Sequence, residues 1–461
     1  MSTRTAAADS DRVLNDICDA PGLDGRKRFD HIIVGAGILG SWTAYHLASR
    51  GKYVLLLDQF PLPHSRGSSM GQSRGIELAS TDENWIPLLM ESYPLWRQLE
   101  EETGENLFEY HDLLIITEVA GGWPVPQIDN LLQSFRTRAA RRVLDPDQVR
   151  KYYPDLHFNN TTAGFVDGSG GILLAAKILN ALRGRITAMN GVIKDQCQVM
   201  RIDAGPPASV LCRGHANTFT ADSVIVTAGP WTSKMLKRVG LDVKIQSSLG
   251  AHMYFPAREG ASIADISFIH YDTEKRFRAW THPVVEYPGL VKLGIGLWIP
   301  VDPDHRDQDD PYRMREAGIE YVKEHLGCLN QTMAIYETCM YYHIEDKRHI
   351  VSIHPFYDNV VVGAAAGSGF KISPVLGKAL ADLATKRRPA LDVSSFSLDR
   401  FTDRSNQYYL EKYNGFIVIR PLRDEAKNAF VVNNDSALLW NPKFLETFDN
   451  HFRRLRLLKS Y

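Results

Sequence analysis

The sequence has few cysteines, and they are not arranged as a framework. Five occur in 461 residues, an odd number, and no two are separated by the two residues of a CxxC motif. That usage argues against a disulfide scaffold and against a zinc site, and it favours a reducing compartment. We therefore expect no metal centre. The cysteines are Cys18, Cys197, Cys212, Cys328 and Cys339.

Long hydrophobic runs and an excess of charge are also lacking. No apolar run approaches the roughly 18 residues that cross a bilayer. With 53 basic and 54 acidic residues, the net charge is −1, which gives no reason to expect a nucleic-acid partner. Residues 1–28 lack the apolar core of a secretory signal, so we expect a flexible lead-in there. The length predicts two or three domains.

Against this background, one stretch is strongly patterned. Residues 30–40 have the sequence DHIIVGAGILG, an apolar run followed by the spacing G-x-G-x-x-G. Helical apolar spacing follows in residues 41–49, and a second apolar run, residues 53–57, ends at Asp58. A strand, a glycine-rich turn, a helix and a second strand with an acidic end are typical of an adenine-dinucleotide site.

Each glycine has its own role in that interpretation. Gly35 permits the tight turn, Gly37 lets a pyrophosphate approach the backbone, and Gly40 allows close packing of helix on strand. The phosphates would lie at the helix N-terminus, where unpaired N–H groups and the helix dipole favour anions. The alternative is a glycine-rich turn in an ordinary α/β domain.

Three later segments add to the dinucleotide hypothesis. Residues 61–74 form a Pro-, Ser-, Gly- and Arg-rich loop, which either lies on the surface or wraps the cofactor. Residues 223–232 are a β-branched run that ends at Thr-Ala-Gly-Pro. A buried strand at 359–362 runs into small residues 363–369 and then a helix, which brings a second helix N-terminus toward an electron-rich centre.

The sequence pattern changes between residues 245 and 340. Short segments with alternating apolar and polar residues predict an antiparallel sheet there. We expect it to form a second domain. Over the chain beyond the dinucleotide segments, strands are expected at 113–116, 250–255, 266–270, 276–280 and 290–298. Helices are expected at 83–102, 145–152, 171–182 and 312–325.

Taken together, these motifs resemble the monomeric sarcosine oxidase family of flavoproteins. The similarity is greatest to its eukaryotic branch, the peroxisomal sarcosine and L-pipecolate oxidases. It covers roughly residues 29–400. The motifs, in order, are DHIIVGAGILG, PHSRGSSMGQSR, TAGPWT, GLVKLG, ETCMY and GSGFK.

The resemblance implies an α/β fold with a Rossmann-type FAD-binding domain and a second α+β substrate domain built on an antiparallel sheet. It implies an FAD-dependent amine oxidase that oxidises the C–N bond of a secondary amine, or of an N-methyl or cyclic amino acid, to an imine, with O2 reduced to H2O2. The expected boundaries are 29–85, 150–245 and 341–400 for the FAD-binding domain, 86–149 and 246–340 for the substrate domain, and 401–461 for a C-terminal extension.

The resemblance also assigns site residues. It implies catalytic roles for Lys292, Arg74 and Tyr341, with Lys292 promoting oxygen reduction, and a covalent link from FAD to Cys339. Taken alone, Cys339 would be a small buried apolar residue and Lys292 a solvated strand residue. Substrate contacts are expected from Lys371, Glu77 and Trp280. The expected FAD contacts are Gly35, Gly37, Ile38, Leu39, Gly40, Asp58, Gln59, Ser65, Ser68, Ser69, Met70, Arg74, Val199, Ala228, Gly229, Trp231, Cys339, Met340, Gly367, Ser368, Gly369, Phe370 and Lys371.

The chain departs from the family pattern at the substrate positions. Glu77 stands where the family has a second carboxylate-binding arginine, and a carboxylate there would repel an amino-acid carboxylate. Gly296 and Ser368 replace histidines, and Met70 stands at a further histidine position. These changes predict altered substrate specificity. Two alternatives stay open: a dehydrogenase that passes electrons to another acceptor, and a flavin-binding protein that has lost catalysis.

The last segment, residues 401–461, has no family counterpart. We expect a strand near 415–419 and a helix at 442–459 that is basic at its end. Three roles for this helix are considered: packing on the enzyme, association with another protein, and binding to a membrane surface. The chain ends in KSY, which is not an S-K-L type signal. The expected location is intracellular, either cytoplasmic or peroxisomal, and the expected state is a monomer.

Overall fold

A computed structural model describes the greater part of the chain. It covers residues 28–69, 71–78, 85–118, 140–158, 162–261, 267–272, 277–283, 287–308, 312–401, 408–413, 416–421 and 430–433. The chain divides into two compact units, residues 1–398 and 399–461. The expected lead-in at 1–28 and the helix at 442–459 lie outside the described residues, apart from residue 28.

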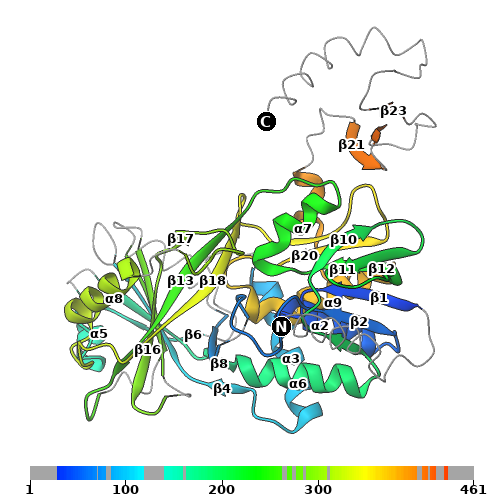
Figure 1. Cartoon of the computed structure of the whole chain (residues 1–461). Coiled ribbons are helices and arrows are strands. Elements are labelled where there is room, and N and C mark those ends of the chain that lie inside the picture. Colours follow the sequence, from blue (N-terminus) through cyan, green and yellow to red (C-terminus); the bar gives the residue numbers. More distant parts are fainter. Residues whose placement is uncertain are drawn as a thin grey trace, which may run out of the picture. The chain divides into compact units, whose positions relative to one another are not determined.

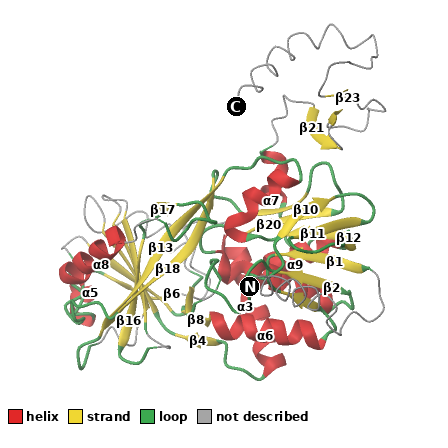
Figure 2. Ribbon diagram, in the orientation of Figure 1, coloured by secondary structure: helices red, strands yellow, loops and turns green. Residues whose placement is uncertain are grey.

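The first unit contains an eight-stranded sheet whose centre is parallel. Its order is β10-β11-β12-β1-β2-β9, with β20 pairing β12 and β19 pairing β20. The apolar runs that predicted strands are buried, and helices pack against the sheet (Figures 1 and 2). The strands are β1 (Phe29–Val34), β2 (Val54–Leu57), β9 (Val192–Lys194), β10 (Val199–Asp203), β11 (Ala208–Cys212), β12 (Phe219–Val226), β19 (Ile350–Ile353) and β20 (Val360–Ala364).

Helices pack beside this sheet and against one another. Helix α2 packs against α6 and α9, and α3 packs against α9. Trp42 and Trp96 meet edge to face in the core, with ring centroids 5.2 Å apart, and Trp96 stacks on Phe370. This aromatic column fixes the loop before α9. The helices are α2 (Ile38–Ala48), α3 (Trp85–Thr103), α6 (Ala175–Ala188), α7 (Thr232–Arg238) and α9 (Ser373–Ala384).

A nine-stranded sheet forms the second part of this unit (Figure 2). Its order is β17-β13-β16-β15-β14-β5-β7-β6, with β18 pairing β13. All pairs are antiparallel except β14 with β5, which run parallel. The strands are β5 (Leu113–Glu118), β6 (Ala140–Leu144), β7 (Thr162–Asp167), β13 (Ile245–Pro256), β14 (Ser267–Asp272), β15 (Phe277–His282), β16 (Leu290–Ile295), β17 (Ile299–Pro300) and β18 (Ile335–Ile344); helices α5 (Pro146–Tyr152) and α8 (Tyr312–His325) accompany it.

Some expectations need correction. The helix predicted at 171–182 begins only at Ala175, because residues 171–174 form β8 (Gly171–Leu174) between β3 (Ser73–Ile76) and β4 (Phe108–Tyr110). Pairing with two distant strands overrides the local helical spacing there. Strand β7 pairs with β5 and β6, although the boundary at residue 150 assigns it to the FAD-binding domain. The domain boundaries otherwise stay a prediction.

The second unit contains a small antiparallel sheet. Its order is β21 (Tyr408–Tyr413), β22 (Phe416–Pro421) and β23 (Phe430–Asn433). Strand β22 covers most of the run expected at 415–419.

Acid should destabilise this fold through its buried histidines. Burial lowers the pKa of His31 and His354 to about 4, and that of His46 to about 3, from 6.5. Below pH 6.5 the unfolded chain takes up protons that the folded protein does not bind, so stability falls as the pH falls toward 4. Each histidine contributes about 1.4 kcal/mol to this loss of stability for each pH unit below 6.5. Urea unfolding at pH 7.5 and 5.5 should differ by about 4 kcal/mol from these three residues; equal stabilities would contradict this expectation.

Candidate functional site

The turn between β1 and α2 accepts only glycine at two positions. Gly35 has φ +106°, and a Cβ there would lie 2.5 Å from the carbonyl oxygen of Thr227. A Cβ on Gly40 would lie 1.9 Å from the carbonyl oxygen of Gly35. Gly40 therefore serves helix packing as expected, and it does not line the adjoining cavity.

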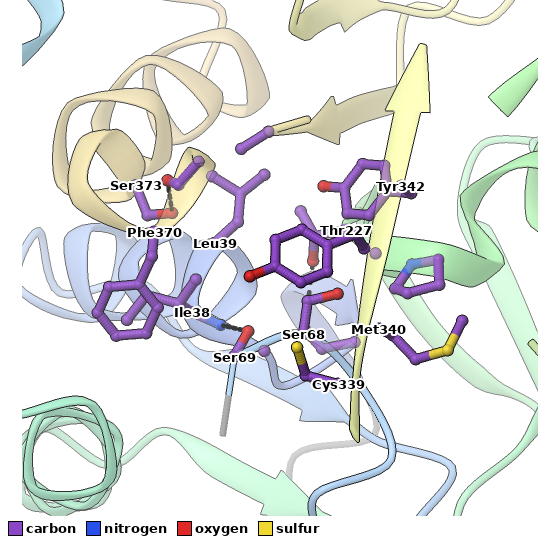
Figure 3. Close-up of a pocket in the computed structure, with 18 of the residues that line it drawn as sticks. Ile38, Leu39, Ser68, Ser69, Thr227, Cys339, Met340, Tyr342, Phe370 and Ser373 are labelled. Atoms are coloured by element: carbon purple, nitrogen blue, oxygen red, sulfur yellow. Dashed lines mark hydrogen bonds between the residues drawn. The ribbon is translucent and has the colours of Figure 1, made fainter. Parts of the chain in front are cut away.

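The N-terminus of α2 faces that cavity. Gly37 caps the helix and offers no side chain. The Ile38 amide donates to Ser69 Oγ at 3.0 Å (Figure 3). Next to it, Ser68 Oγ is buried and has no hydrogen-bond partner among the described residues. A helix N-terminus beside an unsatisfied hydroxyl is suited to bind the oxygens of a phosphate.

Asp58 follows β2, as the motif requires. Its carboxylate accepts the amide of Ala36 at 2.9 Å and that of Phe60 at 3.0 Å, and it lies 3.1 Å from His64 Nε2. Asp58 thus holds the glycine turn and also lines the cavity. Its contact with a ribose stays a prediction.

One cavity brings the predicted residues together. Its empty volume, with the open mouth included, is about 2240 Å³. Ser65 does not line it, and Met70 lies outside the described residues. The predicted residues that line it are Gly35, Gly37, Ile38, Leu39, Asp58, Gln59, Ser68, Ser69, Arg74, Glu77, Val199, Ala228, Gly229, Trp231, Trp280, Lys292, Cys339, Met340, Tyr341, Gly367, Ser368, Gly369, Phe370 and Lys371.

Strand β18 presents Cys339 to this cavity. Cys339 is 7% exposed, and its side chain is drawn among the cavity residues in Figure 3. Burial raises the pKa of the Cys339 thiol, and the positive charges of Arg74 and Lys292 oppose that rise. Burial also raises the pKa of Tyr341, which lies two positions further along the strand.

Strand β16 contributes a buried cation. The Lys292 side chain is 2% exposed. Its Nζ donates to the carbonyl oxygen of Ser73 at 3.1 Å and to Ser73 Oγ at 3.2 Å. A buried ammonium group requires such partners because desolvation is costly. The strand therefore fixes a positive charge on the cavity wall next to Arg74.

The charges at the substrate positions differ from the expectation. Lys371 Nζ pairs with Glu77 Oε1, and both side chains are buried. We expected Lys371 to bind a substrate carboxylate and Glu77 to repel one. In the structure the two groups neutralise each other across 294 positions of sequence. This pair removes a free carboxylate clamp from the cavity.

Several lining or neighbouring residues escaped the sequence analysis, four of which are described here. His252 and His282 lie on the cavity wall, and Arg278 is packed over the Trp280 ring at 5.5 Å. Arg306 connects a loop to β18. Strand alternation in 250–256 and 277–282 places His252 and His282 on the face that also carries Lys292, but which face meets the cavity depends on tertiary packing.

Arg306 joins the loop 61–69 to β18. It is 5% exposed and donates to the carbonyl oxygens of Ser65 and Arg66 at 3.0 and 2.8 Å, and to Thr338 Oγ1 at 3.0 Å. These bonds need the planar guanidinium fork.

Replacing Arg306 with lysine should therefore destabilise the fold. Hydrogen bonds to a charged group contribute about 1.5–3 kcal/mol each, so we expect a loss of about 2 kcal/mol in urea unfolding. Arg66→Lys is the control. Arg66 forms an exposed ion pair with Asp307, and such a pair contributes at most about 1 kcal/mol to stability. Equal effects of the two substitutions would show that the fork does not matter.

Comparison with known proteins decides the family. The family model described as "FAD dependent oxidoreductase" matches residues 30–383. The chain belongs to this family. It is therefore an FAD-dependent oxidoreductase, and its relatives support action on CH–NH donors.

Two relatives are similar over most of their length. The peroxisomal sarcosine oxidase of Homo sapiens is 34% identical over 385 residues, which cover 81% of this chain and 96% of the relative. The monomeric sarcosine oxidase of Bacillus sp. (strain B-0618) is 28% identical over 390 residues, with 81% and 96% covered. The resemblance inferred from the motifs is confirmed.

Solved structures share the fold. NikD, described as an unusual amino acid oxidase essential for nikkomycin biosynthesis, superposes with a TM-score of 0.72 at 20% identity, covering 81% of this chain and 98% of that one. The L-proline dehydrogenase from P. horikoshii gives 0.68 at 17% identity, covering 81% and 98%. The expected fold class, a Rossmann-type α/β domain with a second α+β part, is confirmed.

The residues present fit FAD. Gly35 and Gly37 leave a backbone cradle, the N-terminus of α2 faces the cavity, and the buried Ser68 Oγ lacks a partner among the described residues. Gly367, which also lines the cavity, has φ +64° and precedes the turn Gly369–Ile372, which leads into α9. Among the described residues no group of three or more His, Cys, Asp or Glu is placed to hold a metal ion. Within the same residues, no helix is long and apolar enough to cross a membrane.

Proposed function

We propose that the protein is an amine oxidase that oxidises the C–N bond of a secondary amine, or of an N-methyl or cyclic amino acid, to an imine, and reduces O2 to H2O2. The observation that carries the proposal is the placement of Lys292, Arg74 and Cys339 around a cavity that also contains the dinucleotide turn. FAD, when bound, supplies the transfer of two electrons from the amine to oxygen.

The residues of the chain provide the surroundings for this chemistry. The Lys292 ammonium fixes a positive charge that would stabilise negative charge developing on oxygen. Trp280, Trp298 and Tyr341 supply aromatic walls, with ring centroids of Trp298 and Tyr341 4.2 Å apart. Burial of Lys292 away from water strengthens the effect of its charge.

Substrate preference follows from the Glu77–Lys371 pair. A substrate carboxylate would have to displace Glu77 from Lys371, and Glu77 would then repel it. We propose that the substrate is bound without the carboxylate clamp of the family, so that sarcosine and L-pipecolate are poor substrates. Binding would depend instead on the aromatic wall and on the shape of the cavity.

Covalent attachment is the second part of the proposal. Cys339 would form a thioether with FAD, since its thiol lines the cavity beside Arg74 and Lys292. The assignments of a monomer and of a cytoplasmic or peroxisomal location are kept as predictions; the name of the human relative supports the peroxisome.

Anaerobic bleaching of the purified yellow protein tests the function. The panel holds sarcosine, L-pipecolate, L-proline, N-methylated amino acids, and cationic and uncharged secondary amines. Bleaching by a secondary amine, followed by recovery of the colour and formation of H2O2 in air, is the expected result. Bleaching without recovery in air would favour a dehydrogenase, and no bleaching by any member would contradict the proposed activity. Acid precipitation tests the covalent link, which a colourless pellet would rule out.

A further inference from the structure

A histidine lies against the thiol of Cys339. His252 Nε2 is 3.6 Å from Cys339 Sγ and 3.4 Å from the hydroxyl of Tyr341. The distance to sulfur is that of a weak hydrogen bond. His252 is 6% exposed and lines the cavity.

Sheet register explains this contact. In the antiparallel pair of β13 and β18, Gly250 lies opposite Cys339, and His252 lies opposite Glu337. His252 and Cys339 are therefore diagonal neighbours on one face of the sheet, within reach of a long side chain. The contact is built by the two long strands and does not depend on a surface loop.

Both members of the pair are uncharged before the reaction. Burial lowers the pKa of His252 well below 6.5, as do the charges of Lys292 and Arg74, so its ring is neutral and has one acceptor nitrogen. Burial raises the pKa of the Cys339 thiol, so few thiolates form without a base. Nucleophilic attack by cysteine requires the thiolate.

We propose that His252 is the base that accepts the proton of Cys339 Sγ when FAD becomes covalently attached. This inference rests on the covalent link proposed above. An S–H bond and one C–H bond of a ring methyl group of FAD break, and a C–S bond forms. The two electrons released pass to O2, which leaves with the two protons as H2O2. Arg74 and Lys292 stabilise the thiolate by their charge.

Attachment to the full-length apoprotein tests the role. The protein is produced without flavin and mixed with FAD in air, and the acid-stable fraction and the intact mass are followed with time. His252→Asn should slow attachment by about 100-fold, the order of a general-base effect. Added imidazole should restore part of the rate. Non-covalent FAD binding, measured by fluorescence quenching, should be retained.

Matched variants separate the possible outcomes. Cys339→Ser should abolish attachment, and Tyr341→Phe, which removes the other neighbour of His252, should slow it by less than tenfold. Wild-type attachment rates in His252→Asn would overturn the role of His252 and leave the covalent link intact. Complete release of FAD from the wild-type protein by acid would overturn both.

The pH profile of wild-type attachment gives a second test that needs no variant. The groups facing His252 are Lys292, Arg74, His282, Glu337, Cys339 and Tyr341. If His252 accepts the proton, the rate should be flat between pH 6.5 and 8.5, because its pKa lies well below that range. A tenfold rise for each pH unit would show that the thiol ionises to solvent, and it would overturn the proposal.

Discussion

Replacement of Lys292 with methionine should slow the return of the yellow colour in air by about 100- to 1,000-fold after anaerobic bleaching by substrate. Loss of one preorganised electrostatic group at a reacting centre has effects of this size. The bleaching step itself should change much less, because the ammonium charge is proposed to act on oxygen.

The substitution separates a role in oxygen reduction from a structural role of this side chain. Methionine has a similar length, and it removes the desolvation cost of a buried ammonium group. The Lys292→Met protein should therefore fold and retain FAD. Its hydrogen bonds to Ser73 are the contacts that would be lost.

A stopped-flow experiment measures the effect. The bleached enzyme is mixed with air-saturated buffer, and the recovery of flavin absorbance is followed. Lys323→Met is the control, because that lysine is exposed on α8 and pairs with Glu320. Equal recovery rates for Lys292→Met and the wild type would show that Lys292 does not promote oxygen reduction.

Replacement of Glu77 with glutamine should lower the free energy of unfolding by about 3–5 kcal/mol. The change leaves the ammonium of Lys371 buried without its partner, and loss of one member of a buried ion pair has a cost of this order. The double variant Glu77→Gln/Lys371→Met should recover most of the loss, because it removes the second charge as well. Urea unfolding of the two single variants and the double variant measures the coupling.

The same substitution should change the substrate preference. With Glu77 neutral, Lys371 can receive a substrate carboxylate, and a hydrogen bond to a charged group contributes about 1.5–3 kcal/mol. We expect kcat/KM for sarcosine or L-pipecolate to rise by about tenfold or more. Glu77→Arg, which supplies a second cation, should also raise it. Unchanged kcat/KM in both variants would show that the ion pair does not determine substrate specificity.

Local sequence was sufficient for the dinucleotide turn. Gly35 and Gly40 stand where a Cβ would collide with backbone oxygens, so the spacing itself encodes the geometry. Apolar periodicity also located α8 and several strands of both sheets, because burial on one or two faces produces a regular spacing of apolar residues. The family was inferred from six short motifs and their order along the chain. These motifs can be recognised in the sequence without knowledge of the tertiary packing.

The tertiary structure decided the contacts between distant residues. Glu77 and Lys371 pair across 294 positions, and no local pattern states that two charged residues will be buried together. His252 meets Cys339 because β13 and β18 pair in one register, and a shift by one residue would turn it to the other face. The sequence by itself thus determined the cofactor family and the main elements. The charge of the substrate site and the surroundings of Cys339 were set by the folded arrangement, because they depend on which strand faces become neighbours.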